Sequence, residues 1–287
     1  MNAQPPSRVG RPTLRRRALA NETPIALTIA GSDSGGGAGV QADLKSMSAN
    51  GAFGASVITA ITAQNTAAVT AVHEVPAEIV VAQIDAVLSD LDVDAIKLGM
   101  LFSVPIIEAT AKCLTSFAGP IVVDPVMIAK SGDALLQDAA VTALVRHILP
   151  CAGVLTPNLP EAARLLNTSE ATTPDEMATQ GRRLVAMGPR AVLMKGGHAV
   201  SSVCTDVLVD AGGVVTTYSA PRIDTRNTHG TGCTYSAAIA AHLARGLALE
   251  DAVATAHGYL QAAIAAADTL QVGRGHGPVH HFHSQWG

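Results

Sequence analysis

The chain has 287 residues, of which 48% are hydrophobic and 15% charged, so it can bury a large core and its composition argues against extensive disorder. Its net charge is −4, but residues 1–24 carry five arginines and one glutamate, which leaves an excess of eight acidic side chains in the rest. An acidic body with only 3% aromatic residues argues against nucleic acid as a partner.

The first 24 residues differ in composition from the rest of the chain. They are basic and contain no apolar stretch, so they do not form a secretory signal, and they resemble a transit peptide only weakly. We expect residues 1–24 to be a disordered N-terminal extension or the product of an upstream start codon. Residues 25–287 are then expected to form one domain.

Membrane and redox signals point to one compartment. No apolar run reaches the length of a membrane span, so no membrane association is expected. The four cysteines are scattered and form no C-x-x-C pair, which favours free thiols in a reducing environment over disulfides or a zinc site. The sequence therefore predicts a cytoplasmic protein.

The first half of the chain alternates between apolar runs that end in glycine or polar residues and stretches with helical spacing. The expected strands occupy residues 25–31, 54–62, 94–100 and 120–127. The expected helices occupy residues 38–51, 77–91, 104–117 and 139–150.

The second half continues the pattern and adds a hairpin. The expected strands are 153–158 and 190–198, and the expected helices are 159–167, 173–188, 230–246 and 250–269. Segment 203–221 has two β-rich arms around Asp-Ala-Gly-Gly and predicts a β-hairpin. Thr173 and Glu176 have the spacing of a capping box at the start of their helix.

Strand–helix alternation predicts a mostly parallel sheet covered by helices on both faces. Ligands in such sheets bind outside the carboxyl ends of the strands. Glycine and polar residues gather at those ends, which makes them the place to search for a site.

A glycine-rich turn comes after the first strand, in GSDSGGGAGVQADLKS (31–46). It is not a dinucleotide fingerprint, because Val40 stands where the third glycine would be, and it lacks the Gly-Lys-Ser/Thr of a P-loop. Two interpretations remain open: a turn that allows close packing of helix and strand, or a site where backbone N–H groups and Asp43 face a small substrate.

The segment HGTGCTYSAA opens the helix expected at 230–246. Gly230 and Gly232 allow a tight turn whose N–H groups, with Thr231 between them, point towards an anion at the positive end of the helix. Cys233 lies in that field, which predicts a lowered thiol pKa. The alternative is an ordinary glycine turn with Cys233 as a small buried side chain.

Acidic, amide and basic side chains come after other strands. Asn158 and Glu161 are three residues apart at a helix start and could hold Mg²⁺ through waters, or simply cap the helix. Asp124 before Pro125 suits metal or phosphate chemistry, or bonds to its own turn. Lys195 suits a phosphate, or is a solvated lysine at a strand end.

The C-terminal segment GHGPVHHFH carries four histidines. Metal binding is conceivable for such a composition, but the spacing matches no defined zinc pattern.

Several segments resemble one family together and in its order: LTIAGSDSGGGAGVQADLKS, VITAITAQNT, KLGML, DPVMIAKSGDALL, LTPNLPEAARLL, VLMKGGH, NTHGTGCT and GPVHHFH. From about residue 25 to 282 the chain resembles the hydroxymethylpyrimidine/phosphomethylpyrimidine kinases of thiamine biosynthesis, in the ribokinase-like superfamily. The resemblance implies a three-layer α/β/α fold and two ATP-dependent steps with Mg²⁺. These convert 4-amino-5-hydroxymethyl-2-methylpyrimidine to its monophosphate and then to its diphosphate.

The resemblance also implies roles for individual residues. Gly230, Thr231 and Gly232 would hold the transferring phosphoryl group, and Cys233 would take the place of the aspartate base of sugar kinases. Gln64 would bind the pyrimidine, and Gly31, Asp43, Met100 and Val126 would line the same pocket. Lys195, Asn158 and Glu161 would serve the nucleotide, and Asp124 and Glu161 the metal. The hairpin near 203–219 and the turn before Asn227 would flank the adenine.

Three rival functions stay open. A pyridoxal or pyridoxine kinase shares the fold, the anion site and the cysteine. A sugar or nucleoside kinase is disfavoured because Cys233 replaces aspartate. A non-catalytic pyrimidine sensor is disfavoured because the expected site residues are intact. As in the superfamily, a homodimer is expected.

Overall fold

The computed structural model describes residues 23–127, 138–197 and 202–286. Residues 1–22 of the expected extension lie outside the described residues. The part IAKSGDALL of the motif DPVMIAKSGDALL and His198 of the motif VLMKGGH lie outside them as well. The division into an extension at 1–24 and one domain at 25–287 remains a prediction.

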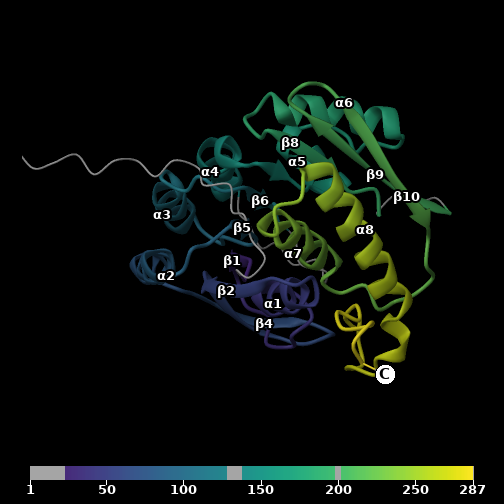
Figure 1. Cartoon of the computed structure of the whole chain (residues 1–287), viewed down its shortest axis with the longest axis horizontal. Helices are drawn as coiled ribbons and strands as arrows, with labels where there is room; N and C mark the ends of the chain where they lie inside the picture. Colours follow the sequence, from purple (N-terminus) through teal and green to yellow (C-terminus); the bar gives the residue numbers. More distant parts are fainter. Residues whose placement is uncertain (1–22, 128–137, 198–201, 287) are drawn as a thin grey trace, which may run out of the picture.

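An eight-stranded sheet forms the middle layer, in the order β10-β9-β8-β7-β6-β5-β1-β2 (Figure 1). Its strands from β1 to β8 pair in parallel, and β9 and β10 run antiparallel at one edge. The strands are β1 (Ile25–Ala30), β2 (Phe53–Ile58), β5 (Ala95–Leu98), β6 (Ile121–Val123), β7 (Val154–Leu155), β8 (Ala191–Met194), β9 (Val203–Asp210) and β10 (Val215–Pro221). The mostly parallel sheet confirms the expected fold class.

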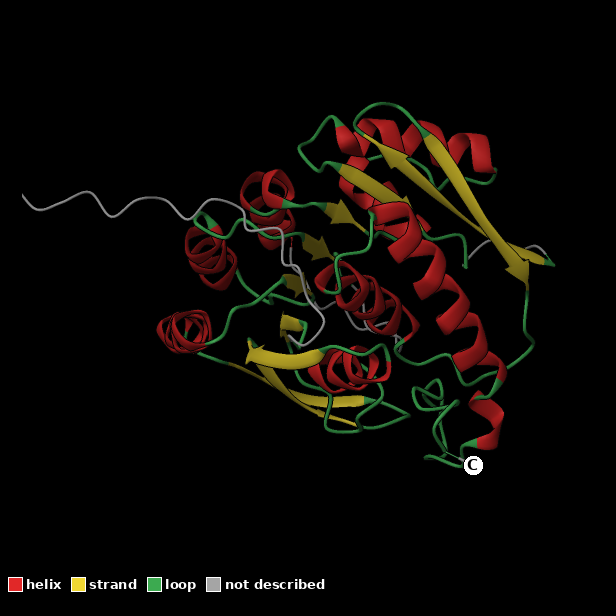
Figure 2. Cartoon of the chain, in the orientation of Figure 1, coloured by secondary structure: helices red, strands yellow, loops and turns green. Residues whose placement is uncertain are grey.

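Helices cover both faces of this sheet (Figure 2). One face packs against α2 (Ala77–Asp90), α3 (Val104–Leu114), α4 (Asp138–His147), α5 (Leu159–Leu166) and α6 (Pro174–Val185). The other face packs against α1 (Gly39–Ala49), α7 (Thr231–Ala244) and α8 (Leu249–Ala265). Because both faces are buried at its centre, β6, β7 and β8 are continuously apolar, whereas β10 at the edge alternates between half-buried and exposed residues.

Neighbouring residues of a strand serve different cores. Leu27 and Ile29 of β1 belong to the core under α2–α6, whereas Ala26 belongs to the core under α1, α7 and α8. Helix α7 lies between α1 and α8 and is buried nearly all round, which explains its run of small residues, Ala237 to Ala241, broken only by Ile239.

The strand expected at 54–62 is wrong as a single element. The chain breaks at Thr59, which is buried and donates its N–H to Ala30 O and its hydroxyl to Met100 O. Beyond the break, β3 (Ala60–Gln64) pairs with β4 (Val69–Glu74) in a separate two-stranded sheet. No local pattern indicates β4, because its side chains are mostly exposed and lack alternation.

Two capping predictions had different outcomes. Asn158 and Glu161 form a complete capping box at the start of α5, with each side chain accepting the other's backbone N–H at 2.8 Å. Thr173 caps α6, but the Glu176 carboxylate accepts from Thr172 instead, so that box is incomplete. Within the described residues, no helix is long and apolar enough to cross a membrane.

Candidate active site

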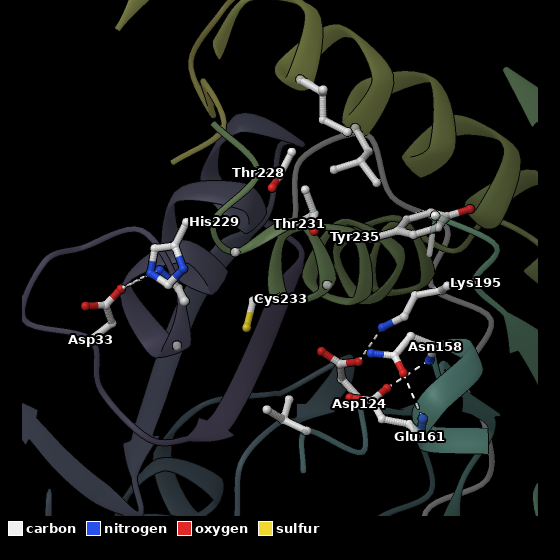
Figure 3. A pocket seen from close by; sticks show the side chains of 18 of the residues that line it. Asp33, Asp124, Asn158, Glu161, Lys195, Thr228, His229, Thr231, Cys233 and Tyr235 are labelled. Atoms are coloured by element: carbon white, nitrogen blue, oxygen red, sulfur yellow. Dashed lines mark hydrogen bonds and ion pairs between the residues drawn. The ribbon is translucent and has the colours of Figure 1, made fainter. Parts of the chain in front are cut away.

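A cavity of about 690 Å³ lies at the carboxyl ends of the parallel strands, bounded by the starts of α5 and α7 (Figure 3). Its wall contains every predicted site residue except Asp43. The members are Gly31, Gln64, Met100, Asp124, Val126, Asn158, Glu161, Lys195, Gly230, Thr231, Gly232 and Cys233.

The glycine turn forms the N-terminus of α7. Gly230 has φ of 79° and a Cβ there would collide with Gly37 O, so only glycine fits the turn. A Cβ on Gly232 would lie 3.3 Å from Lys195 Nζ and 3.4 Å from Asp124 Oδ2. The N–H groups of the first turn of α7 lack acceptors within the helix. They and the Lys195 ammonium border the same space, which suits a phosphoryl group.

The thiol of Cys233 does not behave as the sequence predicted. Burial raises its pKa to about 11, and the carboxylates of Asp43 and Asp124 add to this, although the ammonium of Lys97 opposes them. The prediction of a lowered pKa is therefore wrong, because desolvation outweighs the field of the helix end. Cys233 of the free protein is a neutral thiol.

Asp124 and Lys195 form an ion pair of 2.7 Å at one end of the cavity, beside Asn158 and Glu161 (Figure 3). Lys195 is placed beside α5 by a parallel bridge to Asn158. Burial raises the pKa of Glu161 to about 7, an effect that Lys195 opposes and Asp124 reinforces. The cluster therefore combines one ammonium with two carboxylates that repel each other.

The donor set of this cluster fits Mg²⁺. No group of three or more His, Cys, Asp and Glu residues that could hold a metal exists in the described part of the chain. Kinase magnesium sites need fewer, because one or two carboxylates suffice when phosphates and waters complete the shell. Asp124 and Glu161 meet that requirement, and a divalent cation would offset the repulsion that raises the Glu161 pKa.

Asp43 lies one layer below the cavity. It is fully buried, accepts from Thr28 Oγ1 at 2.6 Å and pairs with Lys97 Nζ at 2.8 Å. The prediction that Asp43 lines the substrate pocket is wrong for this reason, and Lys97 lies at the cavity floor instead. Although burial opposes the charge, Asp43 raises the pKa of Lys97 above its usual value. Lysine in the otherwise apolar strand AIKL was the available signal for this pair.

The other end of the cavity holds Gln64 of β3. Its amide nitrogen is 3.4 Å from His229 Nε2, which in turn is 2.8 Å from Asp33 Oδ2. Asp33 also accepts the N–H groups of Gly35, Gly37 and Ala38. Burial opposes the charge of Asp33, but His229 and the N–H groups of Ala38 and Gly35 lower its pKa. Sequence reasoning missed His229 as a site residue, although it immediately precedes the glycine turn.

Apolar side chains also line the cavity. Met100 is 8% exposed, and its methyl group occupies the space where a Cβ on Gly31 would collide. Gly31, Met100 and Val126 form a wall suited to a flat ring.

A third part of the cavity lies between the β9–β10 hairpin and α8. Its wall includes Cys204 and Pro221 from the hairpin and Ile223 and Thr225 from the turn after it. Leu260 and Ile264 of α8 close the opposite side. The segments expected to flank an adenine do line the cavity, and their role as an adenine site remains a prediction.

Comparisons with known proteins identify the family of this chain. Residues 33–280 match the family model of phosphomethylpyrimidine kinase. The hydroxymethylpyrimidine/phosphomethylpyrimidine kinase of Rhizobium meliloti is 58% identical, over 92% of this chain and 99% of its own length. The enzyme of that name from Escherichia coli is 52% identical, over 91% and 98%.

Solved structures of two kinds superpose on the chain. A phosphomethylpyrimidine kinase from Clostridium difficile has a TM-score of 0.74 at 42% identity, covering 84% of this chain and 99% of its own. The ADP complex of Bacillus subtilis pyridoxal kinase has a TM-score of 0.85 at 35% identity, covering 93% and 100%. The chain therefore belongs to the phosphomethylpyrimidine kinase family.

Proposed function

We propose that this chain is a hydroxymethylpyrimidine and phosphomethylpyrimidine kinase of thiamine biosynthesis. It uses ATP to phosphorylate 4-amino-5-hydroxymethyl-2-methylpyrimidine and then its monophosphate. The observation that carries the proposal is the juxtaposition of an anion-binding turn at Gly230–Gly232 with the Asp124–Lys195 pair, in a family whose close relatives bear this activity in their names.

The ring would bind between Gln64 and the wall of Gly31, Met100 and Val126. A glutamine amide both donates and accepts, which matches the amino group and ring nitrogen of an aminopyrimidine. His229 lies within 3.4 Å of the Gln64 amide and would limit its motion. The hydroxymethyl group would then face Cys233 and the glycine turn.

The transferring phosphoryl group would lie between the N–H groups of residues 230–232 and Lys195. Phosphoryl transfer depends mainly on positioning and charge neutralisation, and both are supplied here by fixed groups. When bound, Mg²⁺ would neutralise phosphate charge, and Asp124 and Glu161 would hold it, with Asn158 fixing Glu161 through the capping box.

Cys233 would act on the first step by orienting the substrate hydroxyl rather than as a preformed thiolate. Its raised pKa means that the thiol is neutral in the free enzyme, and it would meet the hydroxymethyl group in that form. A loose transition state needs little help from a base, since the proton leaves late. In the second step the nucleophile is an anionic phosphate oxygen, which carries no proton to remove at neutral pH.

The adenine would occupy the part of the cavity between the hairpin and α8, against Leu260 and Ile264. This places the nucleotide phosphates between the adenine site and the glycine turn.

A homodimer is proposed as the assembly. Phe53 on the sheet edge and Ile61 on the β3–β4 hairpin are 55% and 51% exposed, and a second copy would cover them. Light scattering after size exclusion tests this: a mass near twice 29.2 kDa supports it, and 29.2 kDa at micromolar concentration contradicts it.

Pyridoxal phosphorylation is the second candidate, because pyridoxal kinases superpose with TM-scores up to 0.85. Their identities of 35% and 31% are below the 58% and 52% of the named pyrimidine kinases. A coupled ADP-release assay with Mg-ATP separates the two. Both pyrimidines should turn over, with pyridoxal slow, and Gln64→Leu should raise the pyrimidine KM. Fast pyridoxal turnover without use of the pyrimidine monophosphate would overturn the proposal.

A further inference from the structure

The C-terminal segment 275–281 contacts the loop after Gln64 and the residues that lead into the glycine turn, and it has no part in the function proposed above. Its glycines and histidines suggest a metal site, yet the described residues contain no cluster of three or more metal-ligating side chains. Val279, His280 and His281 are nonetheless only 0%, 6% and 5% exposed. Metal binding therefore does not explain why this segment is buried.

Its first residues hold the β3–β4 hairpin. The N–H of Gly275 donates to Thr66 Oγ1 at 3.1 Å, and the N–H of His276 donates to Thr66 O at 2.9 Å. Thr66 lies in the loop between β3 and β4, two residues after Gln64. A Cβ on Gly275 would collide with Thr66 O, a backbone atom that cannot turn aside. Only glycine at 275 lets the hairpin take this position.

Its middle residues hold the chain that leads into the glycine turn. The N–H of Gly277 donates to Asn227 Oδ1, and the N–H of His229 donates to Gly277 O, both at 3.0 Å. His229 and Pro278 form a parallel bridge. A Cβ on Gly277 would collide with Asn227 Oδ1. The residues that precede Gly230 are thus fixed by the C-terminal segment.

Its last residues anchor it to two helices. The N–H of His280 donates to Ala263 O at 3.0 Å, and the hydroxyl of Tyr259 donates to His281 O at 2.9 Å, both from α8. His281 Nε2 lies 3.0 Å from Thr234 Oγ1, one residue after Cys233. The segment therefore has a rigid base from which to position the groups it touches.

We propose that residues 275–281 form a strap that sets the distance between the hairpin carrying Gln64 and the turn at 226–230. This rests on the proposed function, since it takes Gln64 as the residue that binds the ring and the turn as the phosphoryl site. Each glycine has its own role: Gly275 positions the hairpin that carries Gln64, and Gly277 positions the residues that precede Gly230. A displacement of about 1 Å between reacting groups costs roughly a hundredfold in rate.

Gly275→Ala and Gly277→Ala, made in the full-length chain, test the strap. The matched control is Gly258→Ala in α8, where a Cβ meets no atom within 4 Å. Gly275→Ala should raise the KM for hydroxymethylpyrimidine about tenfold and leave the ATP KM within about twofold. Gly277→Ala should lower kcat by about ten- to a hundredfold. Gly258→Ala should retain wild-type constants.

Amide hydrogen exchange gives a readout that does not depend on turnover. Gly277→Ala should speed exchange in peptides covering 226–232, since the added Cβ displaces the residue 277 carbonyl from the His229 N–H. Gly275→Ala should speed exchange in peptides covering 64–68. Folded variants with wild-type kinetics and wild-type exchange would overturn the strap.

A second pair of variants covers the case in which the alanine substitutions prevent folding. Thr66→Ser keeps the hydroxyl that accepts from Gly275, whereas Thr66→Ala removes it. A raised pyrimidine KM in Thr66→Ala alone supports the strap, and equal constants in both contradict it. Lack of turnover of either pyrimidine by the wild-type protein would contradict the proposed function instead, and the exchange comparison would still decide the strap.

Discussion

Two lysine–aspartate pairs flank Cys233, and they differ in their access to the cavity. Lys97 and Asp43 are 2.8 Å apart with side chains 0% exposed, whereas Lys195 and Asp124 are 2.7 Å apart and 13% and 2% exposed. Lys97 lies inside β5, and Lys195 comes directly after the end of β8. We call Lys97–Asp43 the sealed pair and Lys195–Asp124 the open pair. The sealed pair supports the floor of the site, and the open pair offers a cation to phosphate.

The sealed pair should dominate stability. Lys97→Met leaves the Asp43 carboxylate buried without its partner and should lower the free energy of unfolding by about 3–5 kcal/mol. Urea denaturation measures this, with Lys97→Met/Asp43→Leu as the control that should recover much of the loss. A single-variant loss under about 1 kcal/mol would show that the pair is not sealed.

The carboxylate beside the open pair should make stability depend on pH. The pKa of Glu161 is about 7 in the folded protein, against 4.5 as the ordinary value, so the folded state holds its proton more tightly. Without Mg²⁺, the free energy of unfolding should therefore fall as pH rises from 4.5 to 7, by up to about 3 kcal/mol. Glu161→Gln should flatten that fall; an unchanged pH profile would contradict the assignment.

The open pair should dominate catalysis. Lys195→Met removes the cation that faces Gly232 and should reduce kcat/KM for ATP about a hundredfold, or about 2.7 kcal/mol. Its free energy of unfolding should change less than that of Lys97→Met, because Asp124 borders the cavity and can be solvated. Steady-state kinetics and urea denaturation on the same samples decide this, and a variant that is unstable yet fully active would reverse the comparison.

Cys233, between the pairs, should affect only the first phosphorylation. Cys233→Ala should slow it about tenfold and change the second by no more than about twofold, because only the first nucleophile carries a proton. A thiol pKa of about 11 also predicts no thiol inflection in the kcat/KM profile between about pH 6 and 9. Equal losses in both steps, measured with each pyrimidine separately, would contradict this role.

Both residues of the open pair were predicted as site residues, whereas neither pair was predicted as a pair and Lys97 was missed. Residues that follow parallel strands meet at one edge of the sheet, so Asp124 and Lys195 could each be assigned to the site from the sequence. Lys97 and Asp43 meet through the packing of α1 on the sheet, which no local pattern encodes. The prediction for the thiol pKa of Cys233 failed likewise, since the helix end was visible in the sequence and the depth of burial was not.

The C-terminal residues show the same limit. GHGPVHHFH suggested metal patterns and matched the family's ending, but nothing local in it indicates its contacts with Thr66 and Asn227, which join segments about 200 and 50 residues away. The layers of the fold were predictable because apolar runs and helical spacing are local signals.

The most direct test of a single site for both steps follows one sample over time by ³¹P NMR, with hydroxymethylpyrimidine and excess Mg-ATP. We expect a monophosphate ester to appear first and then to be converted to a diphosphate, with two ADP formed for each pyrimidine. A reaction that stops at the monophosphate, with one ADP for each pyrimidine, would contradict the claim that one site performs both steps.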